Sequence, residues 1–417
     1  MSDRPLLLLI SSLSRTSREP FLQSVARHYR VWAFVGGEGR PAEVTWEEPY
    51  LAGHTTVDTL DAAACEAAAR ELILAGETVA GVLSYDETRV ETTAELATAL
   101  GLPTSPPEAV ARCRDKAATR AALAAAAVPQ PRSLETGSLA EAARVAARWG
   151  YPVVVKPRNQ ACGFAVTLVS DAAGLPDAYA AASAMGWPET PAHPERPVLV
   201  EEFVAGPEIS VDSAVFDDRV EPMVVARKRT GFPPSFEETG HLVSADDPLR
   251  TDPQLRELLE RTHAALGFTT GVTHTEIKLS DTGFQVIEVN ARLGGGLIPY
   301  LGQLATGADV GLAAAAIACG ATPELTGTAA DGVAEIRFFY PERDMTVRTV
   351  RVDADLLPPG TVRADVLADD GQRMLLPPAG AAWQSRLAQI VVAAHTAEEC
   401  AAALAVGQKA ITIEEEA

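Results

Sequence analysis

Several signals that mark common protein classes are missing from this 417-residue chain. Its five cysteines are scattered, odd in number and without metal-site spacing, as expected for free thiols in a reducing cytosol. No GxGxxG fingerprint follows the first strand-like run, so a dinucleotide-binding role has no support. No stretch reaches the ~20 apolar residues that span a bilayer, and the first residues lack the length and cleavage site of a signal peptide. We therefore expect a cytoplasmic protein with no membrane partner.

The net charge and the length of the chain limit its possible ligands and its number of domains. The formal net charge is −21 at pH 7, so the chain does not offer the basic surface that nucleic acid binding requires, and any phosphate site must be a local basic island. Hydrophobic residues make up 47% and charged residues 22%, which is ordinary for a soluble globular protein. At 417 residues the chain is too long for one small core, and we expect two or three domains.

The first hundred residues alternate between apolar runs and helical segments. We predict strands at 6–11, 31–35 and 79–84, and helices at 20–30, 62–75 and 92–101. This alternation is typical of a parallel sheet with crossover helices, and a proline-rich break ends it, so residues 1–107 are predicted to form a parallel α/β domain. Ligands of such sheets bind beyond the strand ends, which makes Tyr85 a candidate substrate contact.

The most informative stretch is Val272–Gly296, where two β-branched, apolar runs flank a short Asp-Thr-Gly segment. We predict a hairpin with a three-residue loop whose glycine adopts the left-handed conformation. Ser280 then pairs with Phe284, and stepping outward along the ladder places Glu276 opposite Glu288. Directly opposite residues point to the same face, so these two carboxylates would lie side by side and repel each other.

A cation between the two carboxylates would remove the repulsion. Asn290 lies on the same face, because side chains repeat every two residues along a strand, and this set of oxygens suits Mg²⁺ or Mn²⁺ better than zinc. Arg292 and the glycines that follow offer a fork for phosphate or carboxylate beside an approachable backbone. The alternative is a surface hairpin with solvated acids. The opposite face is apolar, which argues against that alternative; it carries Ile277, Leu279, Ile287 and Val289.

Basic residues occur at two places ahead of the hairpin. A helix predicted at 108–127 carries a basic stripe, which is often only a solvated face: Arg112, Arg114, Lys116 and Arg120. Lys156 ends a three-valine strand and would stand at the mouth of a buried sheet. The polar turn after it contains Gly163 and could cover phosphates, although one glycine is a weak signal.

Further candidates lie between this turn and the hairpin. Residues 197–212 are predicted as two strands joined at a Gly-Pro turn. A strand at 220–229 delivers Lys228 among two arginines, and a polar loop at 235–247 contains Glu238 and His241. In such a loop, His241 could simply be exposed.

In this order, the pieces from residue 116 to 296 resemble the ATP-grasp superfamily of carboxylate–amine ligases. The resemblance implies an ATP-grasp domain at 108–326, with a lid subdomain at about 130–205, behind a Rossmann-like domain. The positions that match the family's ATP contacts are Lys116, Lys156, Gly163, Glu201, Glu202, Phe203, Val204, Glu208 and Lys228. Those that match the ligands of Mg²⁺ or Mn²⁺, expected as two ions, are Glu276, Glu288 and Asn290, while Arg292 matches the residue that steadies the transferring phosphoryl group. One departure is the phosphate loop, 159–164, which is poorer in Gly and Ser than is usual for the family.

Within the superfamily, the loop 237–241 and the run 290–296 resemble the L-amino-acid ligases, or dipeptide synthetases. This resemblance implies that ATP is cleaved to ADP and phosphate while an amide bond joins amino acids, or an amino acid and a small carboxylic acid, through an acyl phosphate. It also implies a homodimer. Glu238 and His241 would face the amino acid, and either could accept the proton of the amine. A glycine-lined acyl pocket would include Gly294, Gly295 and Gly296.

The remaining segment, 327–417, is predicted to form a small α+β cap domain. Its strand at 334–340 carries Arg337, which either pairs within the structure or meets a substrate carboxylate. Two other functions stay open. One is a bicarbonate-using carboxylase, although no Met-Lys-Met biotin-attachment sequence occurs. The other is a nucleotide-binding regulatory protein without catalysis, although every matched metal-ligand position is retained.

Overall fold

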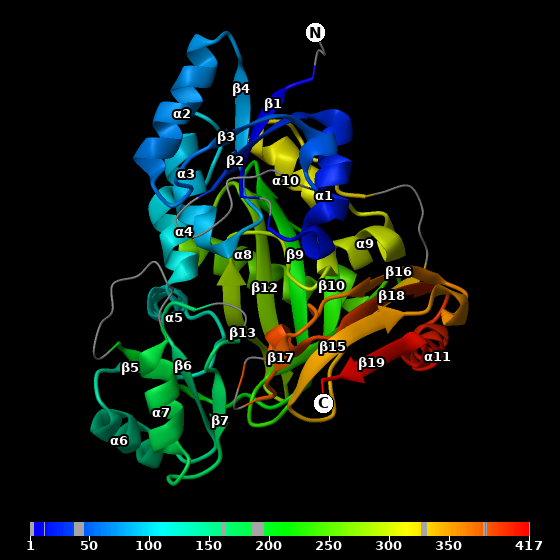
Figure 1. Cartoon of the computed structure of the whole chain (residues 1–417). Coiled ribbons are helices and arrows are strands. Elements are labelled where there is room, and N and C mark those ends of the chain that lie inside the picture. The colour runs from blue at the N-terminus through cyan, green and yellow to red at the C-terminus, as the bar shows by residue number, and fades with distance from the viewer. Residues whose placement is uncertain are drawn as a thin grey trace.

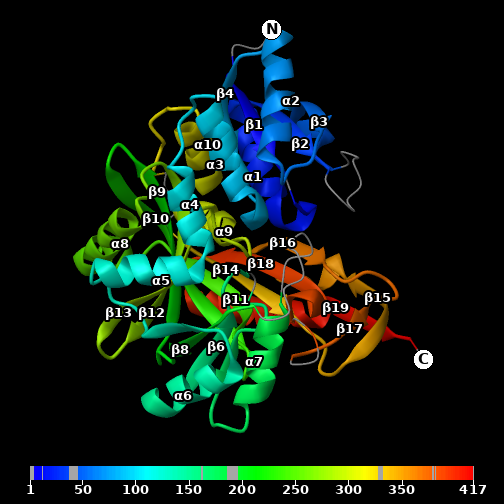
Figure 2. The ribbon, with the colours of Figure 1, turned by 90° about the vertical axis from the view of Figure 1, so that its left-hand side faces the viewer.

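The computed structural model describes residues 4–11, 13–36, 46–160, 163–185, 196–326, 332–377, 380 and 382–416. Figures 1 and 2 show an N-terminal part at the top, a small lid sheet at the bottom, and a large central sheet that continues into the C-terminal part. The functional cavity lies where the lid faces the large sheet, so each part is described by what it brings there.

The N-terminal part is a four-stranded parallel sheet with helices, which confirms the predicted α/β class. The strands lie in the order β3-β2-β1-β4, with bounds β1 (Leu6–Ile10), β2 (Arg30–Val35), β3 (Leu51–Thr56) and β4 (Val79–Leu83). The helices are α1 (Arg15–His28), α2 (Ala62–Leu74) and α3 (Val90–Ala99). Strand β1 is buried along its whole length, as expected for a central parallel strand of leucine and isoleucine. Strand β3 was not predicted, because its sequence LAGHTT lacks a run of large apolar residues.

The helix predicted at 108–127 is two helices, α4 (Pro107–Arg114) and α5 (Lys116–Ala125). Asp115 between them is extended, and its carboxylate accepts hydrogen bonds from the first backbone N–H groups of α5. Lys116 and Arg120 of α5 are buried. The interpretation of the basic stripe as a solvated face is therefore wrong for these two residues.

The lid is a four-stranded antiparallel sheet with its own core. Its strands lie in the order β5-β8-β6-β7, with bounds β5 (Ser133–Thr136), β6 (Val153–Pro157), β7 (Thr167–Val169) and β8 (Val198–Glu202). Helices α6 (Leu139–Trp149) and α7 (Leu175–Ala184) share that core. Gly206 follows the lid with φ of +124°, and a Cβ there would lie 2.1 Å from the backbone oxygen of Leu279, so the connection to the large sheet requires glycine.

The large sheet has eight strands in the order β13-β12-β9-β10-β11-β14-β18-β16. Their bounds are β9 (Glu208–Phe216), β10 (Arg219–Gly231), β11 (Glu237–Ser244), β12 (Gly271–Ser280), β13 (Gly283–Asn290), β14 (Val333–Phe339), β16 (Thr361–Val366) and β18 (Ala388–Ala394). Helices α8 (Pro253–Leu266), α9 (Ile298–Thr306) and α10 (Val310–Ala318) pack on it, and α10 also reaches β4 of the N-terminal part (Figure 1). The polar loop expected at 235–247 is largely strand β11.

The C-terminal segment is joined to this sheet through backbone hydrogen bonds. Strand β14 pairs with β11, and β18 and β16 follow beside it. A second, three-stranded sheet contains β15 (Met345–Val352), β17 (Arg373–Met374) and β19 (Ile411–Glu415), with α11 (Ala397–Gly407) nearby. The boundary expected at residue 327 falls among residues outside the described ranges.

The central hairpin has a different turn from the predicted one. Ser280 pairs with Gly283, which leaves a two-residue loop, so the predicted pairing of Ser280 with Phe284 is wrong. A β-bulge farther along shifts the register by one residue, and Glu276 still lies directly opposite Glu288. The predicted carboxylate pair is thus confirmed, although the turn alone would not have produced it.

The bulge also changes which side chains enter the core. Ile277 pairs with Val286, and both are buried among apolar residues. Ile287 is the extra residue and lines the cavity instead. Its predicted place on the apolar face is therefore wrong.

No single helix among the described residues is long and apolar enough to cross a membrane. In the described part of the chain, one pair of helices, α9 and α10, is long and apolar enough when taken together, with a bend of 107° between them. Most residues of both helices are buried in the protein core.

Candidate active site

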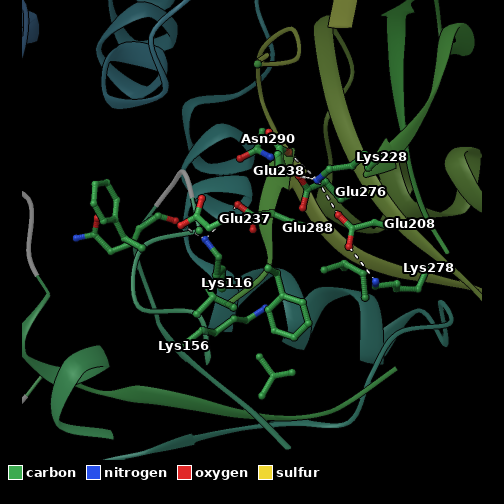
Figure 3. A pocket seen from close by; sticks show the side chains of 18 of the residues that line it. Lys116, Lys156, Glu208, Lys228, Glu237, Glu238, Glu276, Lys278, Glu288 and Asn290 are labelled. Atoms are coloured by element: carbon green, nitrogen blue, oxygen red, sulfur yellow. Dashed lines mark hydrogen bonds and ion pairs between the residues drawn. The ribbon is translucent and has the colours of Figure 1, made fainter. Parts of the chain in front are cut away.

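A cavity of about 300 Å³ lies between the lid and the large sheet. Its walls come from α5, from lid strands β6 and β8, from β9 to β13, and from the segment before β18. Most of the predicted site residues line it: Lys116, Lys156, Gly163, Glu201, Glu202, Phe203, Val204, Glu208, Lys228, Glu238, Glu276, Glu288, Asn290, Arg292, Gly295 and Gly296. Figure 3 shows how the carboxylates and lysines of this set point toward one another.

The facing carboxylates of the hairpin each hold a lysine. Glu276 Oε1 lies 2.6 Å from the Nζ atom of Lys228, and Glu288 Oε1 lies 3.1 Å from the Nζ atom of Lys116. Asn290 lies on the same face of the hairpin, as predicted (Figure 3). Two carboxylates and an amide therefore meet at one wall, and cationic side chains neutralise the carboxylates.

Lys228 on β10 is the centre of the charge network. Its ammonium group contacts Glu208 at 2.7 Å, Glu238 at 3.0 Å and Glu276 at 2.6 Å, while its side chain is only 4% exposed. Burial alone would lower the pKa of Lys228, but the three carboxylates raise it well above its ordinary value. Burial would likewise raise the pKa of Glu238, yet Lys228 and His241 hold it well below its usual range. Lys228 and Glu238 therefore stay charged at neutral pH.

A buried histidine supports Glu276 from behind. His274 Nδ1 lies 2.6 Å from Asp212 Oδ1, and its Nε2 lies 3.8 Å from Glu276. Burial lowers the pKa of His274, but Asp212 outweighs it and raises the pKa to about 9. A Cβ on Gly294 would lie 2.8 Å from the His274 ring, so this glycine packs over the pair and does not line the cavity. Its predicted role as a substrate contact is not supported by this position.

Glu201 anchors the lid side of the cavity through two cations. Its carboxylate pairs with Arg120 at 2.7 and 3.0 Å and with Lys156 at 2.7 Å, and all three side chains are at least 93% buried. Burial would raise the pKa of Glu201, but Arg120 and Lys156 lower it to about 2. Arg120 also donates to the backbone oxygen of Ile287 at the bulge. The sequence predicts Arg120 only as part of a surface stripe, because its partner Glu201 lies 81 residues away in the chain.

One end of the cavity is apolar enough to hold a flat ring. Phe203 and Phe236 stack there with ring centroids 6.3 Å apart, and Val154 and Ile287 complete the walls. Glu208 also lines the cavity, and it pairs with Lys278 at 3.1 Å in addition to Lys228. The polarity of the cavity thus changes along its length.

His241 lies behind Glu238. It is fully buried on β11, and its Nε2 is 3.3 Å from Glu238 Oε2. Its ring meets the edge of Phe338 at 5.7 Å, and a Cβ on Gly296 would lie 2.5 Å from its Nε2. The exposed-loop interpretation of His241 is therefore wrong, and only Glu238 of the two reaches the cavity wall.

The N-terminal part reaches the site through Glu87. Arg292 Nε lies 2.6 Å from the carboxylate of Glu87, in the segment after β4. Tyr85 is 1% exposed, packs against Phe21 at 6.2 Å between ring centroids, and does not line the cavity. Neither Tyr85 nor Glu87 lines the cavity, so the position of Tyr85 does not support its predicted role as a substrate contact.

The C-terminal segment contributes two residues that sequence reasoning missed. Trp383 and Arg386 line the cavity, and Trp383 meets Phe164 of the lid edge to face at 5.8 Å. Arg337 pairs instead with Glu335 at 3.5 Å and does not line the cavity, which favours the structural alternative for it. An arginine and a tryptophan in a segment without a recognisable motif gave no signal in the sequence.

The donor set on the hairpin fits a hard divalent cation. Glu276, Glu288 and Asn290 offer oxygen atoms from one face, which suits Mg²⁺ or Mn²⁺. Across the described ranges, no group of three or more His, Cys, Asp and Glu side chains is arranged to hold a metal. A metal at this site would therefore depend on two carboxylates, the amide and oxygens from a ligand.

Comparisons with known proteins identify the domain family of the central part of the chain. Residues 149–299 match the family model of the ATP-grasp domain. The chain is 34% identical over 237 residues to an uncharacterized protein of Sinorhizobium fredii, covering 56% of this chain and 47% of that protein. It is 31% identical over 259 residues to carnosine synthase 1 of Gallus gallus, covering 58% of this chain and 27% of that protein. The match thus spans about half or less of these relatives.

Solved structures extend the likeness to the whole chain. The L-amino acid ligase of Bacillus licheniformis has a TM-score of 0.80 and 22% identity, with all of both chains covered. A biotin carboxylase of Campylobacter jejuni has a TM-score of 0.71 and 16% identity, with 98% of this chain and 92% of that chain covered. Identities this low establish the fold alone. The chain therefore contains an ATP-grasp domain, and over its whole length it has the ATP-grasp fold.

Proposed function

We propose that the protein is an ATP-dependent carboxylate–amine ligase that forms an amide bond through an acyl phosphate. The observation that supports this most is the convergence, in one cavity, of the Glu276–Glu288 pair with Lys116, Lys156 and Arg292. The names of two similar proteins, L-amino acid ligase and carnosine synthase, favour amino acids or a related small carboxylic acid as substrates.

ATP would lie along the cavity, with its adenine ring at the apolar end and its phosphates at the charged end. The adenine ring fits the apolar end between Phe203 and the bulge residue Ile287, where backbone groups of Glu201 and Val204 can bind it. Glu208 would hold the ribose hydroxyls. Lys116 and Lys156 would contact the phosphates, exchanging part of their ion pairs for the nucleotide.

Phosphorylation makes the carboxylate reactive. A carboxylate oxygen of the acyl substrate attacks the γ-phosphorus, the bond to the bridging oxygen breaks, and ADP leaves. The amine nitrogen then attacks the acyl carbon, the C–N bond forms, and inorganic phosphate leaves with the C–O electron pair. The protein contributes mainly by positioning and charge stabilisation, and one well-placed donor such as Arg292 is worth ~3 kcal/mol of barrier.

The amine must lose a proton during this attack. Glu238 lines the cavity and stays charged, so it would hold the incoming ammonium group. His241 lies 3.3 Å behind it, and an imidazole ring can accept a proton on one nitrogen and pass it on. We infer that the proton passes from Glu238 toward His241. Unimpaired amide formation by His241→Asn would exclude that route.

Glu276, Glu288 and Asn290 would hold Mg²⁺ or Mn²⁺, expected as two ions, which would neutralise charge on the β- and γ-phosphates. Binding the ions requires Lys228 and Lys116 to release carboxylates that they hold in the protein alone. Before the nucleotide binds, these lysines would therefore offset part of the negative charge of this wall.

The decisive experiment is phosphate release from ATP and Mg²⁺ with pooled amino acids. We expect release that depends on amino acids, together with an amide product detected by mass spectrometry. Release driven by bicarbonate would favour a carboxylase, and no release in any mixture would favour a regulatory nucleotide-binding protein. Glu288→Gln is the matched control, because it keeps the shape of the side chain and removes the charge. Light scattering tests the homodimer that the family resemblance implies.

A further inference from the structure

We propose that Arg386 binds the carboxylate of the amine substrate, which makes this substrate an amino acid rather than a simple amine. The inference rests on the proposed ligase function and adds to it a residue that would select an amino acid over a simple amine as the acceptor. Arg386 lies on the cavity wall between a short helical turn, Ala382–Ser385, and β18.

Arg386 differs from the other cations of the cavity in lacking a carboxylate. Six lysine and arginine side chains line the cavity within the described part of the chain. Five of them form ion pairs with carboxylates: Lys116, Lys156, Lys228, Lys278 and Arg292. Arg386 forms no ion pair with any carboxylate that the structure describes, although it stands in a strongly acidic cavity. A half-buried guanidinium held without a counter-ion is a site for an anion.

The guanidinium is nevertheless held in one orientation. It stacks on the ring of Phe338, 3.7 Å from the ring centroid. Its Nε donates to the hydroxyl oxygen of Tyr340 at 3.0 Å, and one terminal nitrogen, Nη2, lies 3.4 Å from the backbone oxygen of Glu238. Among the described residues, the other terminal nitrogen, Nη1, donates to no protein atom. A guanidinium group that is held in one orientation and has free N–H donors is suited to a carboxylate, which accepts two parallel hydrogen bonds.

The contact of Arg386 with Glu238 indicates that the ligand also carries a positive charge. Tyr340 donates to the same backbone oxygen of Glu238, so the arginine is tied directly to the residue that would hold the amine. Arg386 also helps to lower the pKa of the Glu238 carboxyl, which places the two charges within electrostatic reach. A cation beside an anion matches a zwitterion, and an amino acid has its carboxylate and ammonium groups a few bonds apart.

The acyl substrate is a poorer match for Arg386. Its carboxylate must meet the γ-phosphate beside the metal-ligand wall, where Arg292 follows Asn290 by two residues. Arg386 comes from the C-terminal segment, next to Trp383, and contacts the Glu238 end of the wall. Arg292 thus lies near the proposed site of phosphoryl transfer, and Arg386 remains for the carboxylate of the acceptor.

The first test uses the wild-type protein and compares three nucleophiles with the same acyl substrate. Hydroxylamine is small and lacks a carboxylate, so it traps the acyl phosphate as a hydroxamate. The other two are an amino acid and its carboxamide, which differ only in the negative charge. We expect hydroxamate to form, and the carboxamide to show a KM about 10- to 100-fold higher than the amino acid.

The second test removes the arginine. Arg386→Met is expected to raise the KM for the amino acid about 10- to 100-fold and to abolish the preference over the carboxamide, while hydroxamate formation falls far less. Arg386→Lys keeps the charge but loses the fork, so its KM should lie between the two. Arg363→Met is the control: Arg363 lies on β16 of the same segment, pairs with Asp365 at 2.6 Å and does not line the cavity. It should leave the preference intact.

The outcomes separate this inference from the ligase proposal. No hydroxamate and no phosphate release with any carboxylate would overturn the ligase function itself. Hydroxamate formation without a preference for the amino acid over its carboxamide would overturn the role of Arg386 alone. So would an equal loss with both acceptors in Arg386→Met. If that variant does not fold, the wild-type comparison and Arg386→Lys still decide the question.

Discussion

The substitution Glu201→Gln tests the buried charge network that joins the lid to the body of the protein. In the wild type, the single carboxylate of Glu201 forms ion pairs with both Arg120 and Lys156. Glutamine has the same shape but no charge, so both cations would be left buried without a counter-ion. The stability of the protein, rather than its activity, is the quantity that this substitution should change first.

Two estimates of the magnitude agree. Arg120 and Lys156 outweigh burial and lower the pKa of Glu201 from 4.5 to about 2, and at ~1.4 kcal/mol per pKa unit this is worth about 3 kcal/mol at pH 7. Independently, removing one partner of a buried ion pair costs about 3–5 kcal/mol. Because the folded-state pKa lies below the unfolded value, the contribution is present above about pH 4.5 and is lost as the pH falls toward 2. At pH 3 about 1.4 kcal/mol should remain.

Urea unfolding followed by tryptophan fluorescence measures this difference between pH 7 and pH 3. Glu202→Gln is the matched control on the same strand, because Glu202 pairs with Arg132 at 3.1 Å but both side chains are more than 40% exposed. Its cost should be below ~1 kcal/mol. Equal losses in the two variants would refute the reasoning, as would a loss in Glu201→Gln that does not decrease in acid.

Three further predictions concern the metal, an acid-sensitive histidine and the lid connection. Glu276→Gln should lower the rate of ATP-dependent phosphate release by ~10²- to 10³-fold and weaken Mn²⁺ binding measured by electron paramagnetic resonance. Burial lowers the pKa of His263 from 6.5 to about 4, so wild-type stability should fall below pH 6.5 as the unfolded chain takes up the proton, by about 3 kcal/mol near pH 4. His263→Gln should flatten that pH dependence in urea unfolding. Gly206→Ala should destabilise the protein by more than ~2 kcal/mol, because its Cβ would meet the oxygen of Leu279.

Each of these has an outcome that contradicts it. Normal Mn²⁺ binding by Glu276→Gln would remove the hairpin from the metal site. An unchanged pH slope in His263→Gln would mean that another group titrates between pH 4 and 6.5. Gly137→Ala is the control for the glycine substitution, since a Cβ there meets nothing within 4 Å. Equal melting temperatures of the two alanine variants would show that the lid connection tolerates a side chain.

The site could be predicted where its residues share one local segment. Glu276, Glu288 and Asn290 lie within 15 residues, and the period of a strand is enough to place them on one face. Even there, the predicted pairing of Glu276 with Glu288 is right although the predicted three-residue turn is wrong. The bulge at Ile287 adds the residue that the shorter loop lacks. A bulge has no sequence signature in this hairpin, so only the coordinates reveal it.

Residues that meet through the tertiary fold were beyond local patterns. Arg120 reads as one residue of a basic stripe, and its partner Glu201 comes from another sheet. Arg386 and Trp383 reach the cavity because the C-terminal strands extend the large sheet past β11, a pairing between distant segments. In the same way, α10 helps to bury Tyr85, which the strand-end rule had placed at the site.

The place where the lid touches the hairpin has a mechanical consequence. Leu279 donates its backbone N–H to the backbone oxygen of Pro207, and the ammonium group of Lys278 contacts the backbone oxygen of Gly206. The tip of the hairpin is therefore in direct contact with the segment that connects the lid to the large sheet. The base of the same two strands carries Glu276 and Glu288. If these carboxylates bind a metal as proposed, movement of the lid would shift the hairpin that carries them. Lid opening and metal release would then be coupled directly through these two strands.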